Sequence, residues 1–206
     1  EYYRSMFKGS TLSWNLRDQH MAETIDELVA HFVDQGIEPK VAVWEHNSHL
    51  GDARFTESGQ RGQLNVGQLV RERYGDEARL VGFSTYTGTV TAASNWDEPA
   101  QRKRVRPGLP DSYESLFHQV DVPDFFLTLR DGGEVAEALR RPRLQRAIGV
   151  IYRPETERVS HYFYAQLPDQ FDAMIHLDET RAVEPLERVP EWEAFEETPE
   201  TYPFGL

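Results

Sequence analysis

The sequence predicts an α/β fold, in which helices cover both faces of a sheet. Two observations support this class. Stretches with strand character alternate along the chain with stretches of helical spacing, which is the order expected for α/β sheets. The chain of 206 residues is 39% hydrophobic and 28% charged, a length and composition that can bury the core of one such domain.

The first quarter of the chain predicts a long helix followed by a strand. Residues 1–10 have the pattern of the end of a helix, and residues 12–16 alternate as a short extended connection would. Asp18 is a suitable N-cap for an amphipathic helix over residues 18–36. Residues 41–44 then have the pattern of a buried strand.

The remainder of the chain repeats this alternation. Asn65 is a suitable N-cap for a helix that Gly75 ends, and the charged, proline-containing residues 97–111 predict an exposed loop. Residues 87–94 either extend the strand before them or turn into a hairpin. Further helices are expected over residues 112–120 and 134–139, and further strands over residues 79–86, 125–129, 147–152, 162–165 and 173–177.

The net charge of −13 is unevenly spread, because residues 182–206 hold seven glutamates and one arginine. We predict an α/β domain over residues 1–182 and an acidic tail rich in Glu and Pro over residues 183–206. So acidic a chain is not expected to bind nucleic acid, and no apolar run approaches the roughly 20 residues that span a membrane. The absence of cysteine excludes disulfides and thiolate metal sites, and it fits a cytoplasmic protein.

The strongest local signal for chemistry is the sequence WEHNSH over residues 44–49, which follows a predicted strand. Ligand sites in open α/β sheets gather at the carboxyl ends of strands. The imidazoles of His46 and His49 can each accept or donate a proton near neutral pH. Two other interpretations are open: both histidines are structural, or they ligate a divalent cation together with Glu45 or Asp52.

A second candidate pair is Arg17 and Asp18, at the start of the predicted long helix. The guanidinium can hold a carboxylate or a developing oxyanion, and Asp18 can orient it. The alternative is that both residues only cap a surface helix. Arg54 can bind an anion or form a salt bridge, and Ser48 lacks the Gly-x-Ser-x-Gly elbow of a serine nucleophile.

Taken together, these segments resemble the erythromycin esterase family. The likeness rests on RDxxMA at residues 17–22 before a helix and on WxHNxH at residues 44–49 after a strand, in this order. Residues 85–90 and 171–173 also fit, and the likeness extends from residue 1 to about residue 188. The resemblance implies an α/β fold whose sheet is mixed, mostly parallel and flanked by helices. It also implies hydrolysis of an ester, such as a macrolide lactone in antibiotic resistance, although some members carry names such as succinoglycan biosynthesis protein.

The resemblance assigns roles to individual residues. His46 and His49 match the family's downstream histidine pair, which would position the water and stabilise the tetrahedral intermediate, and Arg17 would face the developing oxyanion. Glu45 departs from the family, which has a small residue there; its carboxylate would raise the pKa of His46 or supply a metal ligand. The expected supporting or substrate-binding residues are Asp18, Glu45, Asn47 and Arg54.

The family's principal base histidine belongs to a glycine-rich upstream segment that this sequence lacks. We therefore expect the chain to act with the upstream part of the same polypeptide on a small ester or lactone, without a cofactor. Alone it is expected to be nearly inactive, because loss of a general base costs ~10²–10⁴ in rate. Two alternatives stay open: a metal-dependent hydrolase using His46, His49 and Glu45, and a non-catalytic binding domain of a larger protein.

Overall fold

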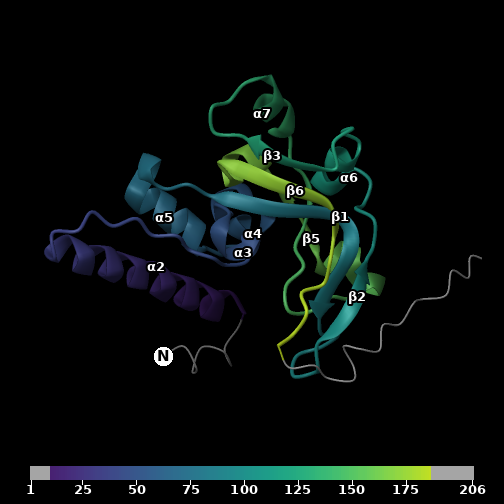
Figure 1. Cartoon of the computed structure of the whole chain (residues 1–206), viewed down its shortest axis with the longest axis horizontal. Helices are drawn as coiled ribbons and strands as arrows, with labels where there is room; N and C mark the ends of the chain where they lie inside the picture. The colour runs from purple at the N-terminus through teal and green to yellow at the C-terminus, as the bar shows by residue number, and fades with distance from the viewer. Residues whose placement is uncertain (1–9, 187–206) are drawn as a thin grey trace, which may run out of the picture.

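A four-stranded mixed sheet lies at the centre of the computed structural model, which describes residues 10–186 (Figure 1). The strand order is β2-β1-β6-β3, and the strands are β1 (Val81–Ala92), β2 (Gln101–Val105), β3 (Asp124–Thr128) and β6 (Ala173–Thr180). The predicted α/β class and the mixed sheet are confirmed. The expected majority of parallel pairs is wrong: β1 and β6 are parallel, whereas β1–β2 and β3–β6 are antiparallel. A short turn joins β1 to β2, and such a turn permits only an antiparallel pair.

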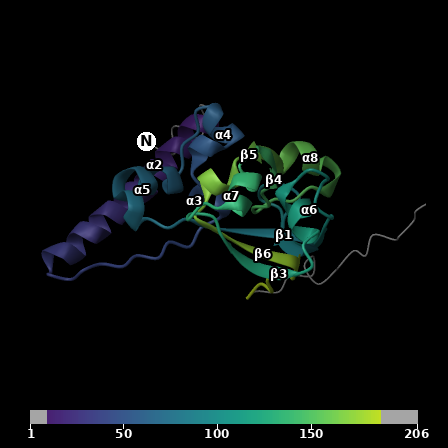
Figure 2. The same ribbon diagram turned by 90° about the horizontal axis from the view of Figure 1, so that it is seen from above.

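Helices α6 (Tyr113–His118) and α7 (Glu134–Leu139) lie over one face of this sheet (Figure 2). The main hydrophobic core includes residues of both helices and of β6. Its buried members are Leu80, Tyr113, Phe117, Leu129, Leu139, Leu167, Phe171 and Met174. On the opposite face, Phe83, Ile175 and Phe126 are neighbours across three strands. Phe83 and Phe126 remain exposed there.

A second, two-stranded sheet pairs β4 (Arg143–Arg146) with β5 (Tyr162–Ala165) in antiparallel fashion. Two short helices flank β5, α8 (Glu157–Ser160) before it and α9 (Leu167–Gln170) after it. The predicted strand at residues 147–152 is wrong in its position. Only Ile151 forms a bridge there, to Ala93 at the end of β1, because the regular pairing with β5 is made by the residues before it.

The long helix α2 (Ser10–Asp34) packs against α5 (Val66–Tyr74), and the short helices α3 (Asn47–Leu50) and α4 (Glu57–Gln60) lie between α2 and the sheet (Figure 1). Two short 3₁₀ turns belong to this region: Ala53–Phe55 lies between α3 and α4, and Gly75–Glu77 follows α5. The predicted caps of α5 are confirmed: the Asn65 side chain accepts from the Gln68 N–H, and Gly75 ends the helix with φ 52°. A positive φ favours glycine, which has no Cβ.

The predicted extended connection at residues 12–16 is wrong, because these residues belong to α2. Their side chains reach the loop before α5: the Trp14 indole donates to the Leu64 carbonyl (2.8 Å), and the Asn15 amide bonds to the backbone of Gly62 and Leu64. Asp18 is therefore an interior residue of α2 and not its N-cap. These tertiary contacts hold residues on the N-terminal side of Asp18 within the helix.

The predicted buried strand at residues 41–44 is also wrong. The segment from Ile37 to His46 has no regular structure, and Val41 and Trp44 are exposed. A strand needs a hydrogen-bonded neighbour, and the β1 edge nearest this segment is engaged by a side chain: Asn47 accepts from the Phe83 N–H (3.0 Å) and donates to its carbonyl (2.5 Å).

The predicted loop at residues 97–111 contains β2, which pairs with Gly88–Ala92 of β1. Residues 87–94 therefore extend the strand and lead into a hairpin. Much of the proposed tail, residues 187–206, and the helix end proposed for residues 1–9 lie outside the described residues, so the two-part division of the chain stays a prediction. No helix between residues 10 and 186 has the length and hydropathy to span a membrane.

Candidate functional site

Helix α2 and the short helix α3 bring Arg17, Asp18 and His49 together into one cluster. The His49 Nδ1–H donates to Asp18 Oδ2 at 2.8 Å, and Arg17 Nη2 lies 3.3 Å from His49 Nε2. The Asp18 side chain is fully buried, whereas Arg17 and His49 keep part of their surface exposed. We refer to these three residues as the Arg17–Asp18–His49 cluster.

The partners of His49 define its tautomer. An ionised carboxylate only accepts hydrogen bonds and a guanidinium only donates them. The Nδ1 atom beside Asp18 therefore carries the proton, and the Nε2 lone pair faces Arg17. A carboxylate on Nδ1 orients an imidazole and stabilises the imidazolium that forms when Nε2 takes a proton. In the observed geometry the Nε2 lone pair lies beside the permanent positive charge of Arg17.

Trp14 is a site residue that the sequence analysis missed. Its ring stacks on the His49 imidazole with centroids 4.4 Å apart and planes 6° from parallel, and the Arg17 guanidinium lies 4.8 Å from its centroid. The available signal was helical spacing, because Trp14, Arg17 and Asp18 fall three and four residues apart on one helix face. Treating residues 12–16 as extended concealed that spacing.

The start of α5 holds the cluster in place from the other side. Asp18 Oδ2 also accepts from the Val66 N–H at 3.3 Å, and Asn65 donates to the Ser48 carbonyl at 2.9 Å and to that of Gly51. One carboxylate therefore orients His49 and satisfies a backbone N–H in the first turn of a second helix. The position of the histidine depends on how α2, α3 and α5 pack.

Glu45 lies beside the cluster with its carboxyl group partly buried. Burial raises the pKa of Glu45, as does the charge of Asp18, while His49 and Arg17 act in the opposite direction. Three buried atoms here form no hydrogen bond within the described residues, namely Arg17 Nε, Asp18 Oδ1 and Glu45 Oε2. Unsatisfied buried polar atoms are costly and concentrate where a site is completed by another group.

His46 is separated from this cluster by its own hydrogen bonds. Its Nε2–H donates to the Ile148 carbonyl at 2.8 Å, and its Nδ1 accepts from the Ser48 N–H at 3.2 Å as the N-cap of α3. Burial lowers the pKa of His46, which favours the neutral ring that this arrangement requires. The structure thus gives His46 the contacts of a residue that fixes the loop.

Asn47 and Arg54 also have defined structural partners. Asn47 pairs with the backbone of Phe83, as described above. Arg54 forms a two-point ion pair with the buried Asp52, from Nε to Oδ1 (2.9 Å) and from Nη2 to Oδ2 (2.7 Å), and its Nη1 lies 3.4 Å from Glu72. Of the two sequence interpretations of Arg54, the structure has the salt bridge.

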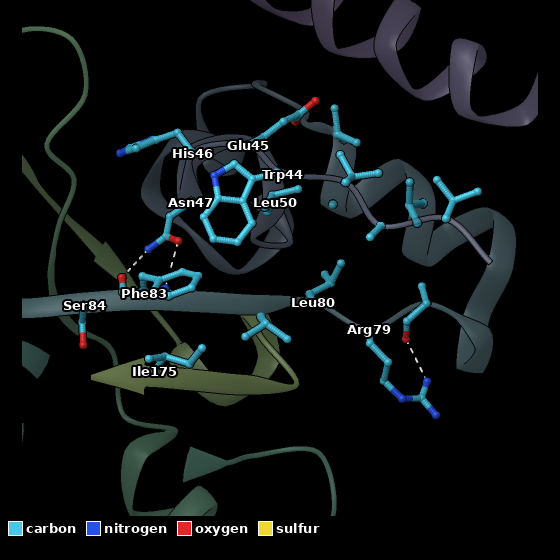
Figure 3. A pocket seen from close by; sticks show the side chains of 18 of the residues that line it. Trp44, Glu45, His46, Asn47, Leu50, Arg79, Leu80, Phe83, Ser84 and Ile175 are labelled. Atoms are coloured by element: carbon cyan, nitrogen blue, oxygen red, sulfur yellow. Dashed lines mark hydrogen bonds between the residues drawn. The ribbon is translucent and has the colours of Figure 1, made fainter. Parts of the chain in front are cut away.

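A large cavity of about 1540 Å³ opens beside Glu45, His46 and Asn47 (Figure 3). Its walls come from α2, the segment before α3, α5, β1 and β6, and they are largely aliphatic and aromatic. In Figure 3, Trp44 lies over Phe83 while the His46 ring points away from both. The cavity is larger than an ordinary small-molecule pocket of about 300–1,000 Å³, and its size and apolar character suit a large organic molecule or a protein segment.

The predicted site residues therefore divide into two groups. Arg17, Asp18 and His49 form one cluster with Glu45 beside it, whereas His46, Asn47 and Arg54 are each bonded elsewhere. Within residues 10–186, no group of three or more His, Asp or Glu side chains is arranged to hold a metal ion. The ring nitrogens of both histidines already have partners in the protein.

Solved structures share this fold. A Bacillus cereus protein is 22% identical with a TM-score of 0.68, and the match covers 82% of this chain and 39% of that one. A succinoglycan biosynthesis protein is 22% identical with a TM-score of 0.66, covering 84% and 40%. A mutant of the erythromycin esterase EreC in its open conformation is 21% identical with a TM-score of 0.56, covering 86% and 41%. The chain thus spans about two fifths of the length of these structures.

The sequence match is more specific than the shared fold. Residues 1–180 match the erythromycin esterase family, and this range contains both motifs, RDxxMA and WxHNxH, together with Trp14 and the start of α5. Since the match covers most of the chain and includes the whole Arg17–Asp18–His49 cluster, the chain belongs to the erythromycin esterase family.

Proposed function

We propose that this chain forms part of the active site of a hydrolase that cleaves a carboxylic ester or a macrolactone with water. The single observation that carries the proposal is the Arg17–Asp18–His49 cluster, in which a buried carboxylate orients an imidazole whose Nε2 faces a guanidinium. We infer a cytoplasmic role in inactivating a small ester, with macrolide resistance as one form of it, on the basis of the cysteine-free sequence and the family.

In the proposed reaction, water attacks the carbonyl carbon and its proton passes to an imidazole. The carbonyl oxygen becomes an oxyanion, which Arg17 stabilises by charge and hydrogen bonding. When Arg17 donates to the oxyanion instead of to His49 Nε2, the freed Nε2 of His49, oriented by Asp18, holds or relays the proton. The tetrahedral intermediate collapses, the bond from carbon to the alkoxy oxygen breaks, and the leaving oxygen takes the proton. No covalent intermediate with the protein forms.

The proposal includes the upstream part of the same polypeptide as a partner. Two features support it. The sheet exposes Phe83 and Phe126 on one face, and exposed apolar patches of a sheet mark surfaces that bind another protein segment. The related structures are more than twice as long as this chain. In this proposal the upstream part packs on that face and carries the principal base histidine.

The test is ester hydrolysis by the longest native polypeptide that contains these residues, compared with the 206-residue chain. Variants His49→Ala and Arg17→Lys are each expected to lower kcat/KM by ~10²–10⁴, because a proton-transfer group or an oxyanion donor is lost. The matched control is His31→Ala, which removes an exposed histidine of α2, the helix that contains Arg17; within residues 10–186 its side chain hydrogen-bonds to Gln35 alone. This control is expected to keep the activity.

Three outcomes would contradict the proposal. If His49→Ala retains the rate within about threefold, the imidazole is not used in the reaction. If the protein holds a stoichiometric divalent ion that His49→Ala removes, the metal-dependent alternative with His46 and Glu45 replaces it. If no aryl, alkyl or macrocyclic ester is hydrolysed by the native polypeptide, the chain is a binding domain.

A further inference from the structure

A second cavity, of about 390 Å³, lies next to the candidate site. His46 and Gly149 line both this cavity and the large one, so the loop containing His46 separates the two. Its volume falls in the range of pockets that hold small molecules. The walls come from the start of α2, the α3–α5 region, the turn after β1 and the residues around β5. They include Trp14, Ser58, Gln63, Trp96, His161 and Gln170.

The walls of this second cavity carry no Asp, Glu, Lys or Arg, although 28% of the chain is charged. Its two histidines are held neutral by their partners. His161 Nε2 accepts from the Arg153 N–H (3.0 Å) and its Nδ1–H donates to the Ala147 carbonyl (3.2 Å), and His46 is bonded at both nitrogens as described. A phosphate, carboxylate or ammonium group would lose its hydration here without an opposite charge. The ligand that fits is neutral.

The same walls offer aromatic surface. Trp96 is 76% exposed and lies in the turn between β1 and β2. Arg153 holds that turn, because it donates from Nε to the Ser94 carbonyl (2.8 Å) and from Nη2 to Asn95 Oδ1 (2.5 Å). The indole of Trp96 therefore lies at the cavity on a turn that side-chain hydrogen bonds hold in place. Such a face suits the apolar side of a ring.

Polar side chains with unused hydrogen-bonding capacity complete the cavity. Within the described residues, the side chains of Ser58 and Gln63 form no hydrogen bond, and Gln170 Oε1 is buried without a partner. Gln170 is only 2% exposed, so this orphaned acceptor is costly unless a donor reaches it. Hydroxyl groups of a ligand can both donate to amide oxygens and accept from amide and hydroxyl hydrogens.

We propose that the second cavity binds a neutral, hydroxyl-bearing ring of the pyranose type. Trp96 lies against the apolar face of the ring, and Ser58, Gln63 and Gln170 face its hydroxyl groups. The uncharged walls exclude phosphorylated and amino sugars. Because the inference concerns binding alone, the presence or absence of ester hydrolysis does not test it. It also places the bound ring beside His46, on the far side of the loop from the large cavity.

The experiment titrates the 206-residue chain with the methyl pyranosides of glucose, galactose, mannose and rhamnose, followed by saturation-transfer NMR and by the indole N–H signals. A ligand of this size is expected to bind with a Kd on the order of 1 mM. Glucose 6-phosphate and glucosamine serve as charged probes and are expected to bind at least about tenfold more weakly than the glucoside.

Two tryptophan variants locate the site. Trp96→Ala is expected to weaken binding of the best pyranoside about tenfold or more. Trp44→Ala is the matched control, because Trp44 is exposed to a similar degree but lines only the large cavity. Gln63→Leu keeps the side-chain size, removes the amide and is expected to weaken binding several-fold. Circular dichroism verifies that each variant folds.

The inference is overturned if none of the four pyranosides binds at concentrations up to about 50 mM, far above the expected Kd. It is equally overturned if the phosphorylated sugar binds as well as the neutral one, or if Trp44→Ala removes binding while Trp96→Ala retains it. If Trp96→Ala does not fold, two other measurements test the site: binding by Gln63→Leu, and the indole N–H signal of Trp96 in the wild-type titration. The site is rejected if that signal does not shift and Gln63→Leu binds the pyranoside as tightly as the wild type.

Discussion

Replacing Asp18 by alanine is expected to destabilise the protein by about 2–4 kcal/mol. The His49 Nδ1–H loses a charge-assisted hydrogen bond of 2.8 Å, and such bonds contribute about 1.5–3 kcal/mol. The Val66 N–H in the first turn of α5 loses its acceptor, an effect comparable to losing a helix cap at about 0.5–2 kcal/mol. Part of this loss is offset, because Asp18 Oδ1 is buried without a hydrogen bond and its removal relieves a desolvation cost.

The assay is urea unfolding at pH 7 followed by far-UV circular dichroism, with the free energy of unfolding extrapolated to water. Asp26→Ala is the matched control in the same helix, because Asp26 is partly exposed and pairs with Arg73 and Tyr74 at the surface. Pairs of this kind contribute at most about 1 kcal/mol. The reasoning is refuted if Asp18→Ala costs no more than Asp26→Ala, since the carboxylate would then not hold α2, α3 and α5 together.

Two further predictions concern packing and pH. Gly67→Ala is expected to destabilise the protein by about 2 kcal/mol or more, because an added Cβ would lie 1.9 Å from the Leu50 carbonyl oxygen. The control is Gly149→Ala, where an added Cβ meets nothing within 4 Å and the change in thermal or urea unfolding should stay within about 0.5 kcal/mol. Equal effects of the two substitutions would contradict the close approach of α5 to α3. Burial lowers the pKa of His176 below its ordinary 6.5, so the unfolded chain binds this proton more readily than the folded protein does. The free energy of unfolding should therefore fall as the pH drops below about 6.5, by up to about 1.4 kcal/mol per pH unit. Between pH 7.5 and pH 5.5 this fall should be smaller for His176→Gln than for the wild type, and an equal fall would count against the burial argument.

Much of the fold could be predicted from the sequence because local signals agree with tertiary structure in those places. The helix at Val66–Tyr74 has an asparagine cap and a terminal glycine, and both act as their chemistry predicts. The helix at Glu134–Leu139 has the predicted bounds. Strands at β1, β3, β5 and β6 follow from runs of apolar and β-branched residues. These elements carry their signals within a few residues.

The failures occurred where a distant segment decides the outcome. Residues 101–105 are charged and look like a loop, but pairing with Gly88–Ala92 makes them a strand. Residues 41–44 look like a strand and have no strand partner in the described chain, because Asn47 occupies the β1 edge at Phe83. Strand formation depends on a neighbour as much as on propensity.

The sequence by itself determined the family, through RDxxMA and WxHNxH, and it named Arg17, Asp18 and His49 as candidates for chemistry. Tertiary structure decided which of them meet. The two histidines lie three residues apart on one loop, and no local rule distinguishes them. Packing of α2 against α5 places a buried carboxylate on His49 at 2.8 Å, whereas the Ile148 carbonyl takes His46. Hydrogen-bond partners across 31 and 102 residues of sequence separate these roles, because the proton chemistry of an imidazole depends on what lies beside each nitrogen and sequence spacing does not encode that.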